Sequence, residues 1–138
     1  MTLELFSDQW AQHWCARLNA SAAYRAAAEG WSGAVALVMT PADGAERHGV
    51  YMDAEGGICR IAREASAEDL AGAAYVFEAA PGVWREVLGG RTAPAMALFS
   101  GKLRLTRGNL AALMPHAAAA RELIATAAAV PVLFADEE

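Results

Sequence analysis

The sequence has few of the residues that build nucleic-acid sites or disulfide frameworks. Lys102 is the only lysine among eleven basic residues, and sixteen acidic residues give a net charge of −5. Nucleic-acid-binding domains usually carry a basic patch, so this balance argues against a nucleic-acid partner. Cys15 and Cys59 are the only cysteines, and two that lie far apart in the chain form no disulfide framework. We therefore expect a protein that works in a reducing compartment.

Neither a membrane-length apolar run nor a leader segment is visible. The longest nearly apolar run, residues 123–135, is shorter than the roughly 20 residues that a span requires, and it contains Pro131. The opening residues, MTLELFSDQW, have no basic region ahead of an apolar one, so we expect no signal peptide. These features predict a cytoplasmic protein, and the excess of alanine and of arginine over lysine is typical of a bacterial GC-rich genome.

The residue patterns of common catalytic and metal sites are also missing. His13, His48 and His116 fall on three separate predicted elements, so they form no ligand pair at helical spacing. There is no nucleophile elbow, phosphate loop or Gly-x-Gly-x-x-Gly turn. We expect neither an enzyme nor a cofactor or metal. An enzymatic alternative would need a polar cluster inside a cavity, and Tyr75 with His116 is the pair to inspect.

Large apolar side chains are what the sequence has in quantity. The 138 residues are 56% hydrophobic and include four Trp, four Phe, three Tyr and five Met. This length is typical of one domain, which we take to span residues 1–138. Side chains of this kind either fill a core or line a cavity, and composition alone does not separate the two.

The first half of the chain predicts one helix and three strands. Ser7 is an expected N-cap, and Phe6, Trp10, Trp14 and Leu18 follow at spacings of four, which predicts a helix to about Glu29 with Gly30 as its stop. Apolar runs predict strands over residues 34–40, 48–54 and 58–64. Pro41 with Asp43–Gly44, and then residues 55–57, are turn signals, so the three strands form an antiparallel meander.

The second half alternates between short helices and strands. Helical turns are expected over residues 66–72, 81–90 and 94–100, and strands over 74–80 and 102–107. Within the first of these strands, Glu78 should face solvent, which places Tyr75 and Phe77 on the buried face. A closing helix runs over 110–130 with a break at Pro115. This order predicts an α+β domain with a five-stranded, mostly antiparallel sheet and helices packed on one face.

Two stretches go beyond generic patterning: LNASAAYRAAAEGWSGAVALVM, residues 18–39, and VWREVLGGRTAPAMALFSGKLRLTRG, residues 83–108. Their order of motifs resembles the sterol carrier protein type two family of small lipid-carrier domains. The motifs are Trp31–Ser32–Gly33, Trp84 to Gly89, Ala95 to Gly101, and Gly101–Lys102–Leu103. The last strand of that family often ends in Gly–Asp, where this chain has Gly108–Asn109. Asparagine also caps a helix, so the change puts only a carboxylate role there in doubt.

The resemblance implies a sheet covered by helices that enclose an apolar tunnel. It implies binding and transfer of a lipid or other long apolar molecule (a fatty acid, an acyl-CoA or a sterol-like compound), and no reaction. The expected tunnel residues are Met39, Met52, Tyr75, Phe77, Trp84, Leu88, Met96, Phe99, Leu103, Leu105, Leu113 and Met114.

Two questions stay open at this stage. Arg91, Lys102 and Arg104 either contact an anionic headgroup or a membrane surface transiently, or are the solvated face of a strand and its flanks. The same fold with its cavity filled by side chains would instead be an interaction or homodimerisation module, and the small faces of Ala117 to Ala120 suit close helix approach.

Overall fold

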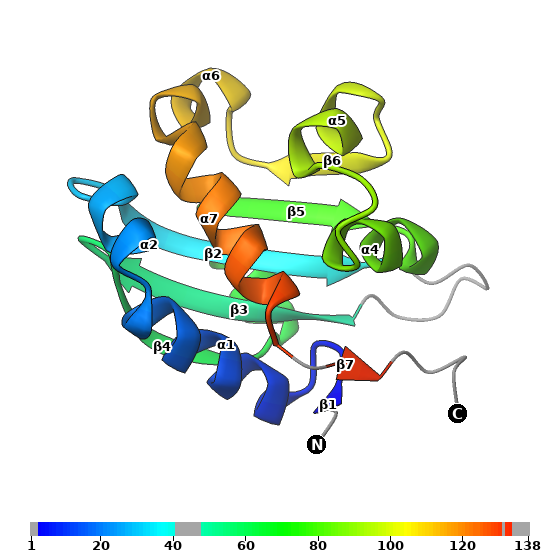
Figure 1. The fold of residues 1–138 in the computed structure, drawn as a ribbon, viewed down its shortest axis with the longest axis horizontal. Helices are drawn as coiled ribbons and strands as arrows, with labels where there is room; N and C mark the ends of the chain where they lie inside the picture. The colour runs from blue at the N-terminus through cyan, green and yellow to red at the C-terminus, as the bar shows by residue number, and fades with distance from the viewer. Residues whose placement is uncertain (1–2, 41–47, 131, 134–138) are drawn as a thin grey trace.

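A mixed five-stranded sheet is the frame of the molecule. The structure is a computed structural model that describes residues 3–40, 48–130 and 132–133. Its strands are β2 (Ser32–Met39), β3 (His48–Glu55), β4 (Ile58–Glu64), β5 (Tyr75–Ala79) and β6 (Leu103–Arg107). They lie in the order β4-β3-β2-β5-β6 (Figure 1), and every neighbouring pair is antiparallel except β2 and β5. The predicted five-stranded, mostly antiparallel α+β fold is confirmed.

Local turn chemistry produces the expected meander of β2, β3 and β4. Gly56 and Gly57 both have positive φ, which suits glycine, and they close the hairpin between β3 and β4. The predicted turn at Pro41 and Asp43–Gly44 lies outside the described residues. After β4 the chain crosses the sheet and returns as β5 beside β2, and this crossover makes β2 and β5 parallel.

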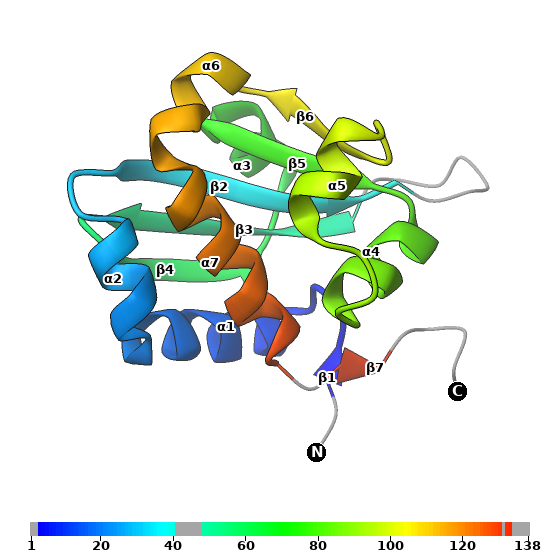
Figure 2. The same cartoon turned by 45° about the horizontal axis from the view of Figure 1, so that its top comes forward.

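Helices cover one face of the sheet (Figures 1 and 2). They are α1 (Asp8–Ala20), α2 (Ala22–Ala27), α4 (Pro81–Leu88), α5 (Pro94–Phe99), α6 (Leu110–Leu113), the 3₁₀ turn η1 (Met114–His116) and α7 (Ala117–Ala128). The crossover helix α3 (Ala67–Gly72) is the exception, because it lies on the opposite face (Figure 2). There Leu70 packs against a small cluster that includes Ala36, Val38 and Val76.

The long first helix that the spacing predicts is broken at Ser21. Ser7 caps α1 as expected, because its side chain accepts a hydrogen bond from the Trp10 N–H at 3.2 Å. Ser21, however, has extended backbone angles, and its side chain caps a new helix by accepting from the Tyr24 N–H at 3.1 Å. A serine hydroxyl competes with the helix for backbone partners, which explains the break. The break expected at Pro115 is confirmed as η1.

The prediction that Glu78 faces solvent is wrong. Tyr75 and Phe77 do pack against the helix-side core, but Glu78 on the other face is buried, with 5% of its surface exposed. It pairs across the strands with Arg104, whose guanidinium lies 3.8 Å from its carboxylate, and it accepts a hydrogen bond from the Thr40 hydroxyl. A buried carboxylate is tolerated because it has such partners.

A small second sheet was not predicted from the sequence. The short strands β1 (Leu3–Glu4) and β7 (Val132–Leu133) pair in parallel as a separate two-stranded sheet that brings the two ends of the described chain together (Figure 1). Among the described residues, no helix is long and apolar enough to cross a membrane.

Candidate functional site

The space between the sheet and its helices is a continuous apolar layer. Six of the twelve predicted tunnel residues lie in one buried cluster, each no more than 7% exposed: Met52, Phe77, Trp84, Leu88, Leu103 and Leu113. They come from β3, β5, α4, β6 and α6, so elements distant in the sequence meet here. The side chains fill this region closely, as in an ordinary core.

Trp84 anchors this layer to the sheet. Pro81 begins α4 at a position where proline is favoured, and Trp84, Val87 and Leu88 then share the buried side of the helix. The Trp84 indole N–H donates to the Val38 carbonyl oxygen at 2.8 Å. A buried indole needs such a partner, so the contact determines where α4 lies over β2.

Three further predicted residues lie at the border of the cluster: Met39, Tyr75 and Leu105 are partly buried and pack against it. The Trp31 ring stacks on His116 with centroids 5.4 Å apart and lies 5.9 Å from the Tyr75 ring. The pair considered for an enzymatic cluster, Tyr75 with His116, thus shares an aromatic neighbour that comes from the Trp31–Ser32–Gly33 motif.

The remaining three predicted residues lie at the surface. Met96 is 63% exposed, Phe99 85% and Met114 61%, so none of these side chains is enclosed between the sheet and the helices. The reason for the first two is the packing of α5, which turns the fully buried Ala97 and the partly buried Leu98 toward the core and leaves Met96 and Phe99 outside. These placements correct the expectation that all twelve residues share an interior.

An apolar pocket opens in the helix layer itself. It has a volume of about 370 Å³ and lies between α7 and the segment that joins α4 to α5. Val87 and Ile124 form part of its wall and also belong to the buried cluster, so the pocket reaches the core. The other lining residues are Gly90, Thr92, Ala93, Pro94, Arg121, Ala125 and Ala128.

None of the twelve predicted residues lines this pocket. Val87 and Ile124 lie on the apolar faces of their helices. The sequence contains no other indication that these two residues line a pocket. The pocket depends on how α4, α5 and α7 pack against one another, and no local pattern encodes this.

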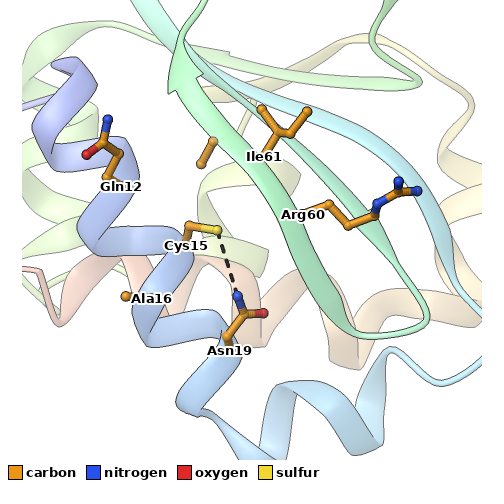
Figure 3. A pocket seen from close by; sticks show the side chains of 7 residues that line it. Gln12, Cys15, Ala16, Asn19, Arg60 and Ile61 are labelled. Atoms are coloured by element: carbon orange, nitrogen blue, oxygen red, sulfur yellow. Dashed lines mark hydrogen bonds between the residues drawn. The ribbon is translucent and has the colours of Figure 1, made fainter.

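A second, more polar pocket of about 470 Å³ lies between α1 and β4 (Figure 3). Its lining includes Cys15, Asn19 and Arg60. The Cys15 thiol donates to the Cys59 carbonyl oxygen at 3.5 Å, and the Asn19 amide bonds both the carbonyl and the N–H of Cys59, at 3.0 and 2.8 Å. The Cys15 side chain, which lines the pocket, therefore contacts the backbone of Cys59, 44 residues away in the sequence.

Burial determines the chemistry of the Cys59 thiol. Burial raises the pKa of the Cys59 thiol, and a hydrogen bond to the Cys15 side chain raises it further. A thiol that resists ionisation is a poor nucleophile and a poor metal ligand. Within the described residues, no group of three or more His, Cys, Asp or Glu side chains could hold a metal ion.

The three predicted headgroup residues are all exposed. Arg91 lies between α4 and α5, and Lys102 between α5 and β6. Arg104 differs from these two because its guanidinium pairs with buried Glu78.

The fold and the apolar layer define an α+β domain with a helix-covered mixed sheet. A crystal structure of sterol carrier protein 2 matches with a TM-score of 0.83 and 43% identity over 92% of this chain and 99% of the other. The solution structure of a conserved hypothetical protein from Thermus thermophilus, whose suggested identity is a sterol carrier protein, matches with a TM-score of 0.81 and 40% identity over 96% and 94% of the two chains. The chain belongs to the sterol carrier protein 2 family.

A more distant structure shares the fold alone. Sterol carrier protein 2 from Yarrowia lipolytica, in its apo form, matches with a TM-score of 0.51 and 13% identity over 88% of this chain and 80% of the other. No protein-family model and no curated protein sequence matches the chain.

Proposed function

We propose that the protein binds and transfers a lipid or another long apolar molecule, such as a fatty acid, an acyl-CoA or a sterol-like compound, and catalyses no reaction. The observation that carries the proposal is the apolar pocket between α4, α5 and α7. It reaches the buried cluster in a chain that is 43% identical to a sterol carrier protein. The cytoplasmic location stays a prediction.

The size of the pocket suggests how a long chain enters. Its volume of about 370 Å³ is near the lower end of the range for small-molecule sites, about 300–1,000 Å³. A long ligand must therefore displace side chains of the cluster. Leu88 is the predicted tunnel residue next to the pocket on α4, because it directly follows pocket-lining Val87. Met39 and Met52 are unbranched and adapt to different ligand shapes.

The energetics favour an exchangeable complex. Burial of a chain gains about 0.8 kcal/mol per methylene, or roughly 12 kcal/mol for sixteen carbons before costs. Association and the displacement of packed side chains cancel a large part of this gain. We place the nine predicted tunnel residues that lie in or against the buried cluster along the path of the apolar chain, and Arg91, Lys102 and Arg104 near its headgroup.

Native mass spectrometry of the purified protein, with organic extraction of bound molecules and titration with a fluorescent fatty acid, tests the proposal. We expect a co-purifying lipid or saturable binding. Ala125→Trp fills the pocket and should weaken binding more than about tenfold. Ala16→Trp is the matched control, because Ala16 is also an exposed helical alanine that lines a pocket. A protein that binds no fatty acid and carries no lipid, or equal affinities in the two variants, would contradict the proposal.

One observation favours a second candidate, an interaction module with the same fold. Six predicted tunnel residues are packed in a closed cluster, as they would be if the interior were simply filled. This alternative predicts a stable homodimer and no bound lipid. Light scattering after size-exclusion chromatography separates the two functions, because the carrier needs no dimer to bind its ligand.

A further inference from the structure

Basic residues are concentrated in one part of an acidic protein. Between Glu86 and Glu122 the chain has five of its eleven basic residues and no Asp or Glu, whereas the rest carries six basic and all sixteen acidic residues. The segment comprises most of the α4–α5 connection, α5, β6, α6 and η1, and it ends near the start of α7. A surface built from this segment therefore attracts anions even though the whole molecule repels them.

The same segment contains an anomalous helix. Met96 and Phe99 are three residues apart on α5, so their side chains share one side of the helix, and that side faces solvent. Burial of a phenylalanine side chain is strongly favourable relative to exposure, because the ring has a large apolar surface. Phe99 is nevertheless 85% exposed, while Ala97 on the same helix is completely buried. Exposed apolar side chains that gather in this way indicate an interaction surface.

Exposed Met114 lies along the same edge of the sheet, beyond the other end of β6 from α5. It lies in η1, and both α5 and the α6–η1 segment stand beside β6, the edge strand of the sheet (Figures 1 and 2). The apolar pocket borders the same region, since Ala93 and Pro94 at the start of α5 and Arg121 on α7 line it. Exposed apolar side chains, exposed cations and the apolar pocket thus all occur on this side of the sheet.

We propose that α5 and η1 form a docking surface for an anionic lipid bilayer. Met96, Phe99 and Met114 would enter the headgroup region, and Arg91, Lys102 and Arg121 would contact the lipid phosphates and carboxylates. We favour an anionic bilayer over an acidic protein as the partner. Flexible apolar side chains and scattered cations can bind lipids, because lipids in a bilayer do not require contacts in a fixed arrangement. This inference rests on the proposed function, because docking would bring the apolar pocket close to the source of the ligand.

Two other cations of the segment are left out of the docking surface. Arg104 pairs with Glu78, and the Arg107 Nε–H donates to the Ala73 carbonyl oxygen at 2.8 Å. Each of these two side chains already has a partner within the protein. Its removal would therefore disturb the sheet edge as well as any contact with a bilayer.

Co-sedimentation with vesicles tests the surface. We expect the protein to bind phosphatidylcholine vesicles that contain phosphatidylserine more tightly than pure phosphatidylcholine vesicles, and less tightly as salt increases. The apolar variant Met96→Ser/Phe99→Ser and the charge variant Arg91→Glu/Lys102→Glu should each lower partitioning more than about tenfold, because the first removes the inserted apolar area and the second reverses two surface cations. All four side chains are exposed, so folding should survive both changes.

Matched controls come from the opposite edge of the sheet. Ile58→Ser/Ile61→Ser removes exposed apolar side chains from β4, and Arg17→Glu reverses an exposed charge on α1. Both should bind vesicles like the unchanged protein. Equal partitioning of the α5 variant and the β4 control, or equal binding to the two kinds of vesicle, would overturn the proposal.

A titration with fluorescent fatty acid in the absence of vesicles separates this inference from the function on which it rests. The α5 variant should keep its fatty-acid affinity and lose vesicle binding. Normal fatty-acid binding with unchanged vesicle binding in that variant overturns the docking surface alone. Vesicle binding by a protein that takes up no fatty acid overturns the carrier function instead.

Discussion

The Trp84 indole donates a buried hydrogen bond to the Val38 carbonyl oxygen at 2.8 Å, which joins α4 to the central strand β2. Trp10, on α1, is equally buried, but its indole N–H has no hydrogen-bond partner among the described residues. These two tryptophans therefore differ in one interaction, although both side chains are enclosed in the same core.

Trp84→Phe should destabilise the protein more than Trp10→Phe does. Both substitutions remove buried volume, but only the first takes away the partner of a buried carbonyl. We expect a loss of about 2–4 kcal/mol for Trp84→Phe and a loss smaller by about 1 kcal/mol for Trp10→Phe. Urea unfolding gives both free energies. Equal losses would show that the Val38 hydrogen bond adds nothing net.

Tyr24→Phe should be neutral or stabilising at neutral pH, by up to about 1 kcal/mol. The Tyr24 hydroxyl is buried and has no hydrogen-bond partner among the described residues. Burial, with a smaller contribution from Cys59, raises the pKa of Tyr24 to about 12. A free energy of unfolding at pH 7 that falls by more than about 1 kcal/mol would mean that the hydroxyl has a partner after all.

The same substitution should reduce alkaline destabilisation. The folded state keeps the Tyr24 proton up to a pKa of about 12, whereas the unfolded chain releases it near the ordinary value of 10.0. The unfolded state then binds fewer protons, so the contribution of this group is complete below pH 10 and is lost as the pH rises toward 12. The difference in unfolding free energy between Tyr24→Phe and the unchanged protein should grow over this interval.

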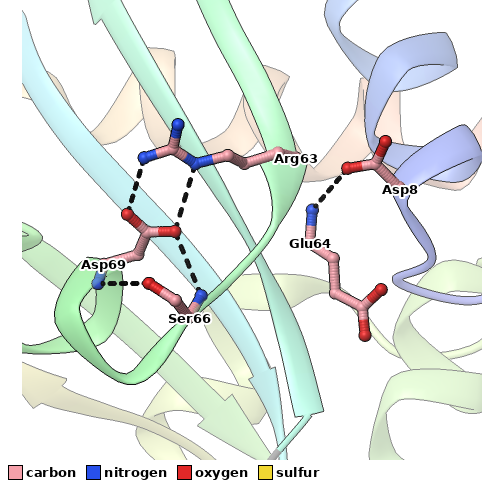
Figure 4. Close-up of polar contacts among 5 residues, drawn as sticks. All are labelled: Asp8, Arg63, Glu64, Ser66 and Asp69. Carbon is pink, nitrogen blue, oxygen red and sulfur yellow. Dashed lines mark hydrogen bonds and ion pairs between the residues drawn. The ribbon is translucent and has the colours of Figure 1, made fainter.

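Asp69→Asn should lower stability at neutral pH by about 1 kcal/mol, and the loss should disappear in acid. Asp69 receives hydrogen bonds from Arg63 at 2.8 and 3.2 Å and from the Ser66 N–H at 3.0 Å (Figure 4). The Arg63 hydrogen bond is the main reason that the pKa of Asp69 lies below its ordinary value of 3.8.

The sign follows from that lowered pKa. The stabilisation is complete above pH 3.8, where the unfolded carboxyl is ionised, and it is lost as the pH falls through the lower folded value. Unfolding free energies measured between pH 7 and about pH 2 check this. Glu68→Gln is the control, because Glu68 is an exposed neighbour in the first turn of the same helix. An Asp69→Asn effect that persists unchanged in acid would contradict the assignment.

Cys15 should react with iodoacetamide in the folded protein, whereas Cys59 should not. Cys15 lines an open pocket, but Cys59 is 3% exposed and burial raises the pKa of its thiol. Mass spectrometry at pH 8 should find one label per chain, and Cys15→Ser should remove it while Cys59→Ser retains it. Similar rates at the two cysteines would mean that β4 opens readily beside α1.

Most secondary structure follows from short-range signals. Ser7 and Ser66 cap the helices that the sequence predicts, Pro115 interrupts the last helix, and the five predicted strands appear within a few residues of their expected ends. Capping and proline geometry act over a few residues, and the alternation of side chains acts along a single strand, so a sequence displays them directly.

The break at Ser21 and the burial of Glu78 show where these signals fail. A serine inside an amphipathic pattern is compatible with either a continuous helix or a new cap, and here Ser21 caps α2 while Leu18 and Tyr24 on either side of the break are both buried in the core. Glu78 occupies the position that alternation assigns to the outer face, but Thr40 and Arg104 from two neighbouring elements surround it. No local sequence pattern predicts which residues of the neighbouring strands lie beside Glu78.

For the candidate site, residue type, periodicity and motif order were enough to predict the family, the sheet and nine of the twelve apolar residues expected between sheet and helices. The folded arrangement was needed to find that Met96, Phe99 and Met114 face outward, that the Cys15 thiol contacts the Cys59 backbone, and that a pocket opens beside Val87 and Ile124. Each of these facts depends on how separate elements pack, and packing is a relation among residues distant in the chain.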